Sequence, residues 1–277
     1  MNSDKLSIFG LGYVGGTAAI CFKELGYTIY GVDIDKGKQK QFKHDINVVG
    51  YKKALDNTDV SFICVPTPCK KNGDIDLSYV ETVCKQISEY KPMQIVVMRS
   101  TVFPNQIVKL EKMVDNLVIN PEFLREATAD YDFMNPPFII VGSKNIDIAR
   151  KVMNVYNKIN TKKYFTTPEE AQMIKYVCNV WHACKISFTN EIGNVCNKLD
   201  IDGEKIMDIF KQDTKLNIST AYHRIGEAFG GHCLPKDLSV FIYQSQKIGL
   251  DNCLIESIYK SNKQHITYQE KIINDRR

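Results

Sequence analysis

Short apolar runs alternate with longer amphipathic segments through the first half of the chain. The runs have the length and composition of buried strands, and we expect them at 5–9, 28–32, 60–65, 94–98, 117–119 and 138–141. Between them, apolar residues recur at helical spacing, most clearly at about 13–25, 78–90 and 145–157. This alternation predicts an α/β fold built on a doubly wound parallel sheet.

The pattern changes after residue 165. Thr167, Pro168 and Glu170 form a capping box with proline at the first helical position, and the next Pro or Gly is Gly193. We therefore expect one long helix over 168–198, about 45 Å in length. Further helices are expected at about 203–211, at 236–247 and from 255 onward. The predicted domains are thus 1–165, which contains the sheet, and 166–277, which is all-helical.

A glycine-rich turn joins the first strand to the first helix. It reads Gly10-Leu11-Gly12-Tyr13-Val14-Gly15, and the second strand ends at Asp33. The glycines let a pyrophosphate approach the helix N-terminus, and an acid at this place accepts hydrogen bonds from the ribose of NAD and repels the 2′-phosphate of NADP. The pattern predicts a Rossmann-like NAD site; the alternative is a glycine-rich turn in another kind of α/β domain.

Hydroxyl side chains follow two strands of the predicted sheet. Thr67 comes after the strand at 60–65, and Thr101 comes after the strand at 94–98. Ligands of open parallel sheets lie at the carboxyl ends of the strands. A single hydroxyl at such a place is more often a turn or cap residue, but two at equivalent ends favour a binding site.

The stretch Ala228–Asp237 contains the strongest candidate for a nucleophile. Gly230 and Gly231 precede Cys233, and Lys236 and Asp237 follow it where a helix is expected to begin. A cysteine near a helix N-terminus and a cation is favoured as a thiolate nucleophile, and the carboxylate can handle protons. The alternative, a Gly-Gly turn with Cys233 as a small buried hydrophobe, has equal weight from this stretch alone.

Composition narrows the classes of function. The net charge of +4 is small and scattered, which gives no indication of nucleic-acid binding. The longest apolar stretch is interrupted by glycines, so no membrane span is expected, and the N-terminus does not resemble a signal peptide. The nine cysteines are odd in number and lie mostly in apolar patterns, which predicts a reducing, cytoplasmic location without disulfides. We expect no metal site.

Six motifs together resemble the signature series of the nucleotide-sugar 6-dehydrogenases, which include UDP-glucose and GDP-mannose 6-dehydrogenases. They are GLGYVG at 10–15, VPTP at 65–68, RSTV at 99–102, NPEFLRE at 120–126, KYVCNVWHACKISFTNEIGN at 175–194 and AFGGHCLPKD at 228–237. The order matches from the first strand to the last helix, and details of several segments are similar to the GDP-mannose branch. The resemblance implies two successive NAD-dependent oxidations of a sugar C6 alcohol, in polysaccharide biosynthesis.

The resemblance also implies roles for individual residues. Cys233 matches the nucleophile, Lys175 and Asn179 match the pair that stabilises the oxyanion, and Asp237, Glu122 and Thr101 match residues that handle water and protons. From spacing alone, the Lys175–Asn179 pair is more simply a solvated helix face. Cofactor contacts are implied for the glycine turn (Gly10, Gly12, Tyr13, Val14 and Gly15) and for Asp33, Lys38, Thr67, Thr101 and Lys236. Sugar-nucleotide contacts are implied for Glu122, Lys175, Asn179, His182, Asn190, Tyr222, Arg224 and Gly230.

The chain departs from the family pattern in two places. The family has a further α/β domain after the last helix, and this sequence ends inside what resembles the helix that leads into it; the segment between Asp33 and Asp59 is also shorter. Three functions are therefore considered: a nucleotide-sugar 6-dehydrogenase, a non-catalytic NAD-binding homologue or partner subunit, and a 3-hydroxyacid dehydrogenase. The last needs no thiol. The apolar excess of the long helix predicts a homodimer.

Overall fold

A computed structural model of the chain describes residues 4–223, 228–231, 233–251 and 253–275. The chain divides into two compact units, Met1–Cys178 and Asn179–Arg277. The division falls inside the long helix α8 (Pro168–Lys198), which has the bounds expected from the capping box and the absence of internal breakers.

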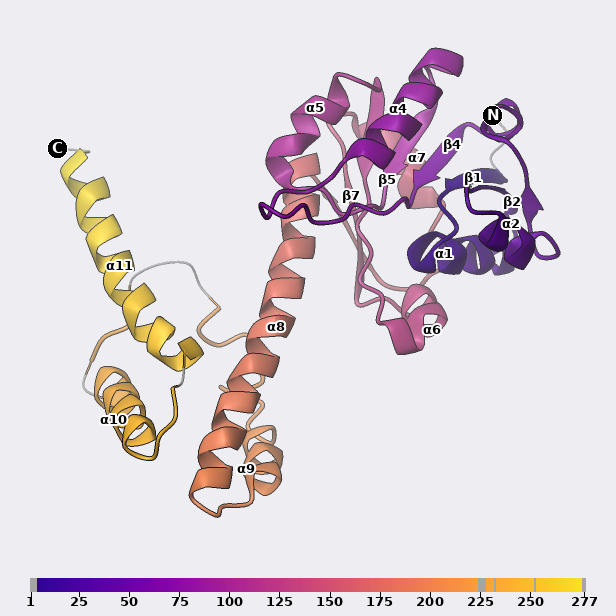
Figure 1. Ribbon diagram of the computed structural model, residues 1–277. Helices are drawn as coiled ribbons and strands as arrows, with labels where there is room; N and C mark the ends of the chain where they lie inside the picture. Colours follow the sequence, from indigo (N-terminus) through magenta and orange to yellow (C-terminus); the bar gives the residue numbers. More distant parts are fainter. Residues whose placement is uncertain (1–3, 224–227, 232, 252, 276–277) are drawn as a thin grey trace. The chain divides into compact units, whose positions relative to one another are not determined.

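The first unit is built on one eight-stranded sheet (Figure 1). Its strands are β1 (Lys5–Phe9), β2 (Thr28–Val32), β3 (Asn47–Val48), β4 (Val60–Ile63), β5 (Ile95–Met98), β6 (Asn116–Ile119), β7 (Phe138–Gly142) and β8 (Lys162–Thr166). Their spatial order is β3-β2-β1-β4-β5-β6-β7-β8. The chain starts in the interior of the sheet at β1, adds β2 and β3 toward one edge, and then crosses back to β4 on the other side of β1. This is the expected Rossmann-like arrangement, with β3 and β8 added to the predicted strands.

Helices cover both faces of this sheet. They are α1 (Tyr13–Glu24), α2 (Lys36–Phe42), α3 (Tyr51–Asn57), α4 (Ser78–Tyr90), α5 (Ile107–Glu111), α6 (Ala129–Met134) and α7 (Ile146–Asn154). One apolar core joins the sheet to α1, α6 and α7 around the fully buried Phe22. A second core joins the other face to α3, α4, α5 and the start of α8. Figure 1 shows α1 and α6 on one side of the sheet and α4 and α5 on the other.

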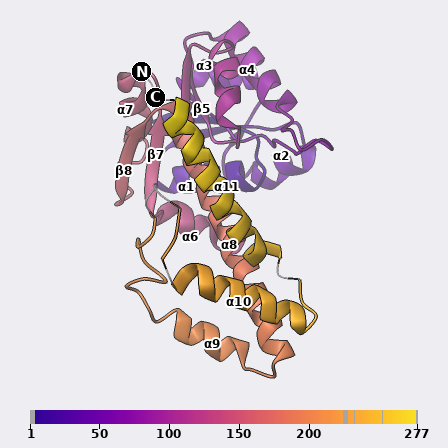
Figure 2. The same ribbon diagram turned by 90° about the vertical axis from the view of Figure 1, so that its left-hand side faces the viewer.

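The direction of β7 differs from the prediction of a fully parallel sheet. β7 pairs antiparallel with β6 through Ile119 and Gly142, and then pairs parallel with β8, its neighbour in Figure 2. A parallel connection must bring the chain back from the carboxyl end of one strand to the amino end of the next, which needs a crossover as long as the strands. The α-helix between β6 and β7 has only six residues, about 9 Å. Alternating apolar runs predict the order of the strands but not the direction of each one.

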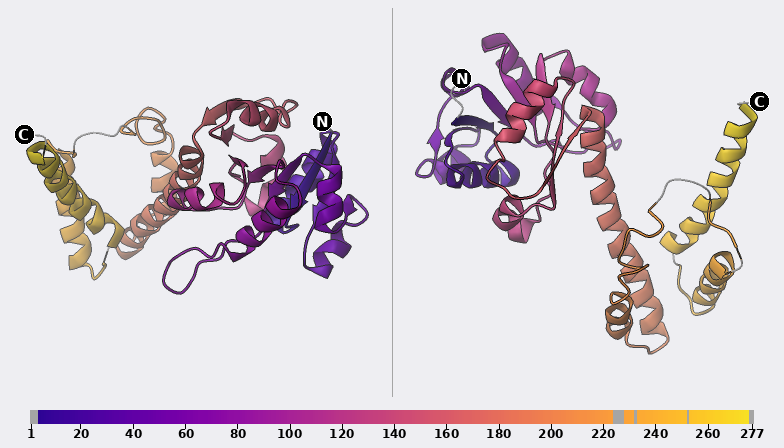
Figure 3. Two further views of the ribbon diagram at one scale, coloured as in Figure 1. Left: turned by 90° about the horizontal axis from the view of Figure 1, so that it is seen from above. Right: turned by 180° about the vertical axis from the view of Figure 1, so that it is seen from behind.

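The second unit is helical throughout its described elements. After the C-terminal part of α8 come α9 (Gly203–Phe210), α10 (Cys233–Lys247) and α11 (Cys253–Asp275). Figure 3 shows α10 and α11 as adjacent helices, and Gln246 of α10 donates to Glu256 of α11 at 2.8 Å. Glu191 of α8 accepts from the backbone N–H groups of Leu254 and Ile255, at 2.8 and 3.1 Å, and so satisfies donors in the first turn of α11.

Two sequence-based boundaries change in this unit. α10 begins at Cys233, three residues before the predicted start, so the thiol lies in the first helical turn instead of ahead of it. Pro235 is tolerated there because its missing N–H belongs to the first turn, where N–H groups have no intrahelical acceptor. α11 likewise begins at Cys253. Among the described residues, no helix is both long and apolar enough to cross a membrane.

Candidate active site

The glycine turn after β1 has the backbone that a dinucleotide site requires. Gly10 has φ +90° and donates its N–H to Val32 at 2.8 Å. A Cβ on Gly15 would lie 1.8 Å from the carbonyl oxygen of Gly10, so the helix can approach the turn only with glycine there. Gly12 precedes α1 without a side-chain cap, which leaves the N–H groups of its first turn for an anionic ligand. The turn therefore fits the pyrophosphate of NAD.

Asp33 connects this turn to the end of β2. Its Oδ2 accepts from the N–H of Leu11 at 2.5 Å, and its Oδ1 accepts from the N–H of Asp35 at 2.8 Å. An open cavity of about 400 Å³ lies beside it, lined in part by Val32, Val48 and Gly50. Lys38, in α2, is half-buried, and its ammonium donates to Gln41 at 3.4 Å.

Ile34 was not singled out from the sequence. It lines the same cavity and is 87% exposed, which is high for a large apolar side chain next to a polar ligand site. The signal in the sequence was its position directly after Asp33, at the mouth of the predicted site.

The loops after β4 and β5 are brought together. Thr67 donates its hydroxyl to the carbonyl of Thr101 at 2.8 Å, and Ser100 donates to the carbonyl of Val65 at 2.6 Å. The two threonines predicted at equivalent strand ends thus meet at the carboxyl edge of the sheet. They line one edge with the glycine turn, because β1 pairs with β4 and β4 with β5.

Glu122 and Lys175 form a buried ion pair at the end of β6. Lys175 Nζ lies 2.8 Å from Glu122 Oε1, with only 9% and 11% of the two side chains exposed. The second carboxylate oxygen accepts from the N–H of Leu124 at 2.7 Å, and Nζ lies 5.7 Å from the centre of the Phe123 ring. The prediction from spacing alone, that Lys175 lies on a solvated helix face, is therefore wrong. Asn179, one turn further along α8, is exposed.

The carboxylate of Glu122 lies near enough to the glycine turn to affect the pKa of Tyr13. Tyr13, the first residue of α1, has a raised pKa, chiefly through partial burial and then through the nearby carboxylate of Glu122. Val14 beside it is half-buried. The predicted cofactor turn and the predicted proton-handling carboxylate therefore belong to one region of the first unit.

The second unit carries the remaining candidates, most of them exposed. His182 and Asn190 are exposed on α8, and Tyr222 is 84% exposed with φ +63°, a backbone conformation that side chains other than glycine seldom adopt. His223 next to it packs edge-on against Trp181, with ring centres 5.2 Å apart. Arg224 lies outside the described residues.

Cys233 is exposed at the first position of α10. This contradicts the alternative in which it is a small buried hydrophobe. Gly231 before it has φ +80°, and a Cβ on Gly230 would meet no atom within 4 Å. Lys236 and Asp237 form an exposed ion pair of 3.0 Å in the following turn.

Asn262 of α11 anchors the segment that leads to Cys233. Its Oδ1 accepts from the N–H of Phe229 and its Nδ2 donates to the carbonyl of Phe229, both at 2.9 Å. Asn262 could not be identified from the sequence, because nothing in a helical pattern distinguishes an asparagine that pairs with a distant backbone from one that faces solvent.

The other cysteines divide by exposure. Burial raises the pKa of the Cys21, Cys64 and Cys84 thiols to about 12, so these thiols stay protonated near neutral pH. Burial also raises the pKa of Cys178. Only Cys69 and Cys253 share the exposed class with Cys233 among the nine, all of which are free in the structure. Within the described residues, no three His, Cys, Asp or Glu side chains gather as metal ligands would.

Comparison with known proteins gives consistent matches over both units. The model of the UDP-glucose/GDP-mannose dehydrogenase family NAD binding domain matches residues 4–50 and 43–160, and that of the family's central domain matches 169–264. GDP-mannose 6-dehydrogenase of Pseudomonas aeruginosa is 39% identical over 95% of this chain and 69% of its own length. UDP-glucose 6-dehydrogenase of Bacillus subtilis is 30% identical over 97% of this chain and 65% of its own length.

A solved structure agrees with these matches. The crystal structure of a ternary complex of the Pseudomonas aeruginosa GDP-mannose dehydrogenase has a TM-score of 0.91 and 36% identity, covering 98% of this chain and 71% of that one.

Proposed function

Because the chain belongs to the UDP-glucose/GDP-mannose dehydrogenase family and has its NAD-binding domain, we propose that it oxidises the C6 alcohol of a nucleotide sugar to the uronate. GDP-mannose is the first candidate substrate and UDP-glucose the second, because the GDP-mannose 6-dehydrogenase is 39% identical in sequence and the UDP-glucose 6-dehydrogenase 30%. The observation that carries the proposal is the exposed thiol of Cys233 in the first turn of α10, which a single oxidation of an alcohol would not require.

In this proposal the cofactor is bound mainly by residues of the first unit. The amide groups at the start of α1 bind the pyrophosphate, Asp33 receives the ribose hydroxyls, and the exposed Ile34 covers the adenine in the neighbouring cavity. Lys38, Thr67, Thr101 and Lys236 provide further contacts. NAD supplies the hydride acceptor for each of the two oxidations.

In the first oxidation, the alcohol loses a proton from oxygen, which the carboxylates of Glu122 and Asp237 pass on to water, and a hydride from C6, which NAD would accept. Lys175 and Asn179 donate hydrogen bonds to the alkoxide that develops, and electrostatic donors of this kind are the usual source of large rate effects. Glu122 holds the ammonium of Lys175 in place at 2.8 Å until the sugar oxygen competes for it. The product of this step is an aldehyde.

In the second oxidation, the sulfur of Cys233 adds to the aldehyde carbon and gives a thiohemiacetal. Loss of a second hydride and of the hydroxyl proton turns this intermediate into a thioester. Water then attacks the thioester carbon, with Asp237, Glu122 and Thr101 handling the protons, and the carboxylate and the free thiol are released. His182, Asn190, Tyr222, Arg224 and Gly230 are the proposed contacts of the sugar nucleotide.

The direct test is an assay of NAD reduction with a panel of nucleotide sugars. Two NADH formed for each sugar consumed is the expected stoichiometry, with uronate as the product. One NADH per molecule of a small hydroxyacid would favour a 3-hydroxyacid dehydrogenase. NAD binding by calorimetry without turnover of any sugar would favour a non-catalytic homologue.

We also propose that the protein forms a homodimer through α8. Val177, Val180 and Ile186 are between 59% and 66% exposed on this helix, and apolar surfaces of this kind usually mark interfaces. Val180→Glu is expected to convert the dimer to a monomer in light scattering at micromolar concentration, while exposed Lys185→Glu leaves it intact. A wild-type monomer would contradict the proposal.

A further inference from the structure

A buried polar network lies behind Glu122 and has no place in the function proposed above. Arg99, Asn120 and Tyr156 are 6%, 2% and 3% exposed. Nη1 of Arg99 donates to Asn120 Oδ1 and to the hydroxyl of Tyr156, both at 2.8 Å. The Tyr156 hydroxyl donates in turn to Asn120 Oδ1 at 2.5 Å.

Arg99 is a buried cation without a carboxylate partner in the described part of the chain. Burial acts to lower its pKa, but Tyr156, Cys64 and Glu122 outweigh burial, and the pKa of Arg99 is raised. The guanidinium lies 5.4 Å from the centre of the Phe133 ring, and its Nε has no hydrogen-bond partner among the described residues. A buried charge with incomplete pairing is costly for folding, so simple stabilisation does not account for it.

The network is connected to Glu122 through the backbone. Asn120 is held on two sides, because its Nδ2 also donates to the carbonyl of Ile140 on β7 at 2.8 Å. Pro121, with its restricted φ, is the single residue between Asn120 and Glu122. Arg99, Asn120, Glu122 and Tyr156 also line one small cavity of about 30 Å³, so the network and the carboxylate are neighbours in space.

The segment is fixed at its other end as well. Arg125 and Asp132 form a bidentate ion pair, with Nε–Oδ2 of 3.0 Å and Nη2–Oδ1 of 2.7 Å, and the N–H of Arg125 donates to the same carboxylate at 2.9 Å. Glu122 thus lies between two anchored points. A short segment anchored twice has few conformations in which the carboxylate can meet Lys175 at 2.8 Å.

We propose that Arg99, Asn120 and Tyr156 are positioning residues that hold Glu122 against Lys175 and so fix the ammonium group that acts on the sugar oxygen. This rests on the proposed function for the role of Lys175, but the positioning itself does not depend on turnover. Tyr156 is the sharpest place to test it, because Tyr156→Phe removes the hydroxyl and leaves the ring, which packs 5.4 Å from Phe22.

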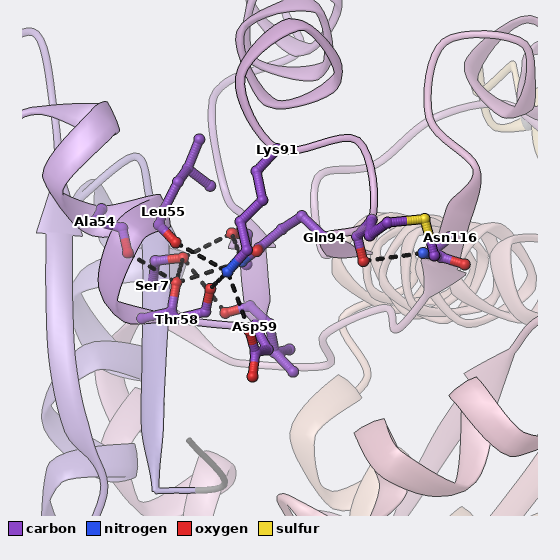
Figure 4. A network of polar contacts seen from close by, with 11 residues as sticks. Ser7, Ala54, Leu55, Thr58, Asp59, Lys91, Gln94 and Asn116 are labelled. Atoms are coloured by element: carbon purple, nitrogen blue, oxygen red, sulfur yellow. Dashed lines mark hydrogen bonds and ion pairs between the residues drawn. The ribbon is translucent and has the colours of Figure 1, made fainter. Parts of the chain in front are cut away.

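A matched control exists at the opposite ends of the same strands. Thr58 is 1% exposed and its hydroxyl donates to Ser7 Oγ and to the carbonyl of Ala54, both at 2.9 Å, inside the network drawn in Figure 4. Thr58→Val therefore also removes a buried hydroxyl from a polar network at nearly constant volume. That network includes Lys91 and Gln94 and contains none of the residues that anchor Glu122.

The first measurement is the rate of lysine acylation, followed by peptide mass spectrometry. Lys175 should label slowly in the wild type relative to exposed Lys85. Tyr156→Phe should speed labelling of Lys175 about fivefold, as expected from one lost buried hydrogen bond. Arg99→Met should do the same, and Arg99→Lys should restore part of the protection. Thr58→Val should leave labelling of Lys175 unchanged.

The second measurement is steady-state kinetics on the sugar that the wild type oxidises. Tyr156→Phe should lower kcat about tenfold, as a misplaced group does, with KM for NAD unchanged. Equal labelling of Lys175 in wild type and Tyr156→Phe, or equal acceleration in Thr58→Val, would overturn the inference. If no sugar is oxidised by the wild type, the proposed function fails alone, and the labelling still decides the positioning role.

Discussion

The two units differ in how they hold their functional side chains. In the first unit, two apolar cores cover both faces of the sheet, and the candidate residues Asp33, Thr67 and Glu122 all have hydrogen-bond partners. In the second unit, the only described residues that are buried are Val195, Cys196, Ser245 and Ile255. Its large apolar side chains are instead widely exposed, Ile209 at 62% being one example.

This difference indicates which groups of the candidate site are held in place before any ligand binds. The cofactor turn and the Glu122–Lys175 pair are fixed by their own unit, so they need no ligand to take shape. The segment around Cys233 is fixed mainly where Asn262 holds Phe229, and the residues beyond it are exposed. We expect the second unit to reach its working form when its exposed apolar surface is covered by a partner copy or by substrate.

The largest expected effect is at Cys233, in the second unit. Cys233→Ser should reduce uronate formation by roughly 10³-fold or more, because the ester that serine would form is a poor substitute for the thioester. NADH per sugar, together with the mass of the protein, would reveal a stalled intermediate. Cys253→Ser, at the start of α11, is the matched control and should keep full activity. Wild-type uronate formation in Cys233→Ser would refute covalent catalysis at this residue.

The next largest effect is expected at Lys175, in the first unit. Lys175→Ala should lower kcat on the order of 100-fold, since it removes the cationic donor proposed for the developing oxyanion. Lys91→Ala serves as the control, because Lys91 also pairs with a carboxylate, Asp59 at 3.0 Å, but at the opposite end of the strands. That variant should lose thermal stability and retain kcat. A comparable loss of kcat in both variants would mean that Lys175 acts through folding.

A pair of glycine substitutions compares the packing of the two units. Gly15→Ala places a Cβ 1.8 Å from the Gly10 carbonyl oxygen, whereas Gly230→Ala meets no atom within 4 Å. The gain in helix propensity at position 15, about 1 kcal/mol, is smaller than such a clash. We expect Gly15→Ala to lower the free energy of unfolding by about 1–3 kcal/mol and to abolish NAD binding.

Gly230→Ala is the control for Gly15→Ala. Gly230→Ala should change the free energy of unfolding in urea by less than about 0.5 kcal/mol and leave NAD affinity unchanged in calorimetry. Similar losses of stability for both variants would show that the second unit is packed as tightly as the first around Gly230, and would remove the contrast drawn above.

The smallest effect concerns the reactivity of two exposed thiols. Cys233 and Cys253 are both first residues of helices, but only Cys233 follows a Gly-Gly segment and precedes a lysine and an aspartate within four residues. A limiting dose of iodoacetamide should label Cys233 about fivefold faster, because the open Gly-Gly segment lets the reagent approach its exposed sulfur. Bound NAD should change that rate. Equal labelling of Cys233, Cys253 and the half-buried Cys184 would mean that Cys233 is not an activated thiol and that the Gly-Gly segment is only a turn.

Much of the fold and of the candidate site was predictable from local pattern. The glycine turn and the start of α8 depend on residues that are close in sequence, so backbone sterics and capping specify them locally, and Asp33 was recognised from its place at the end of the second predicted strand. The same holds for the Gly-Gly approach to Cys233. The family motifs added roles to these residues, and the matches over 4–160 and 169–264 confirmed the family.

The tertiary structure alone decided what depends on distant parts of the chain. The antiparallel direction of β7, the burial of Lys175 beside Glu122 and the attachment of Phe229 to Asn262 join residues 23 to 53 positions apart. The Arg99–Tyr156 bond joins residues 57 apart. No periodicity encodes such pairs, because hydrogen bonds and ion pairs are specified by which side chains the packed core brings together. The sequence by itself therefore determined the elements and the chemistry they carry, and the packing decided which residues work together.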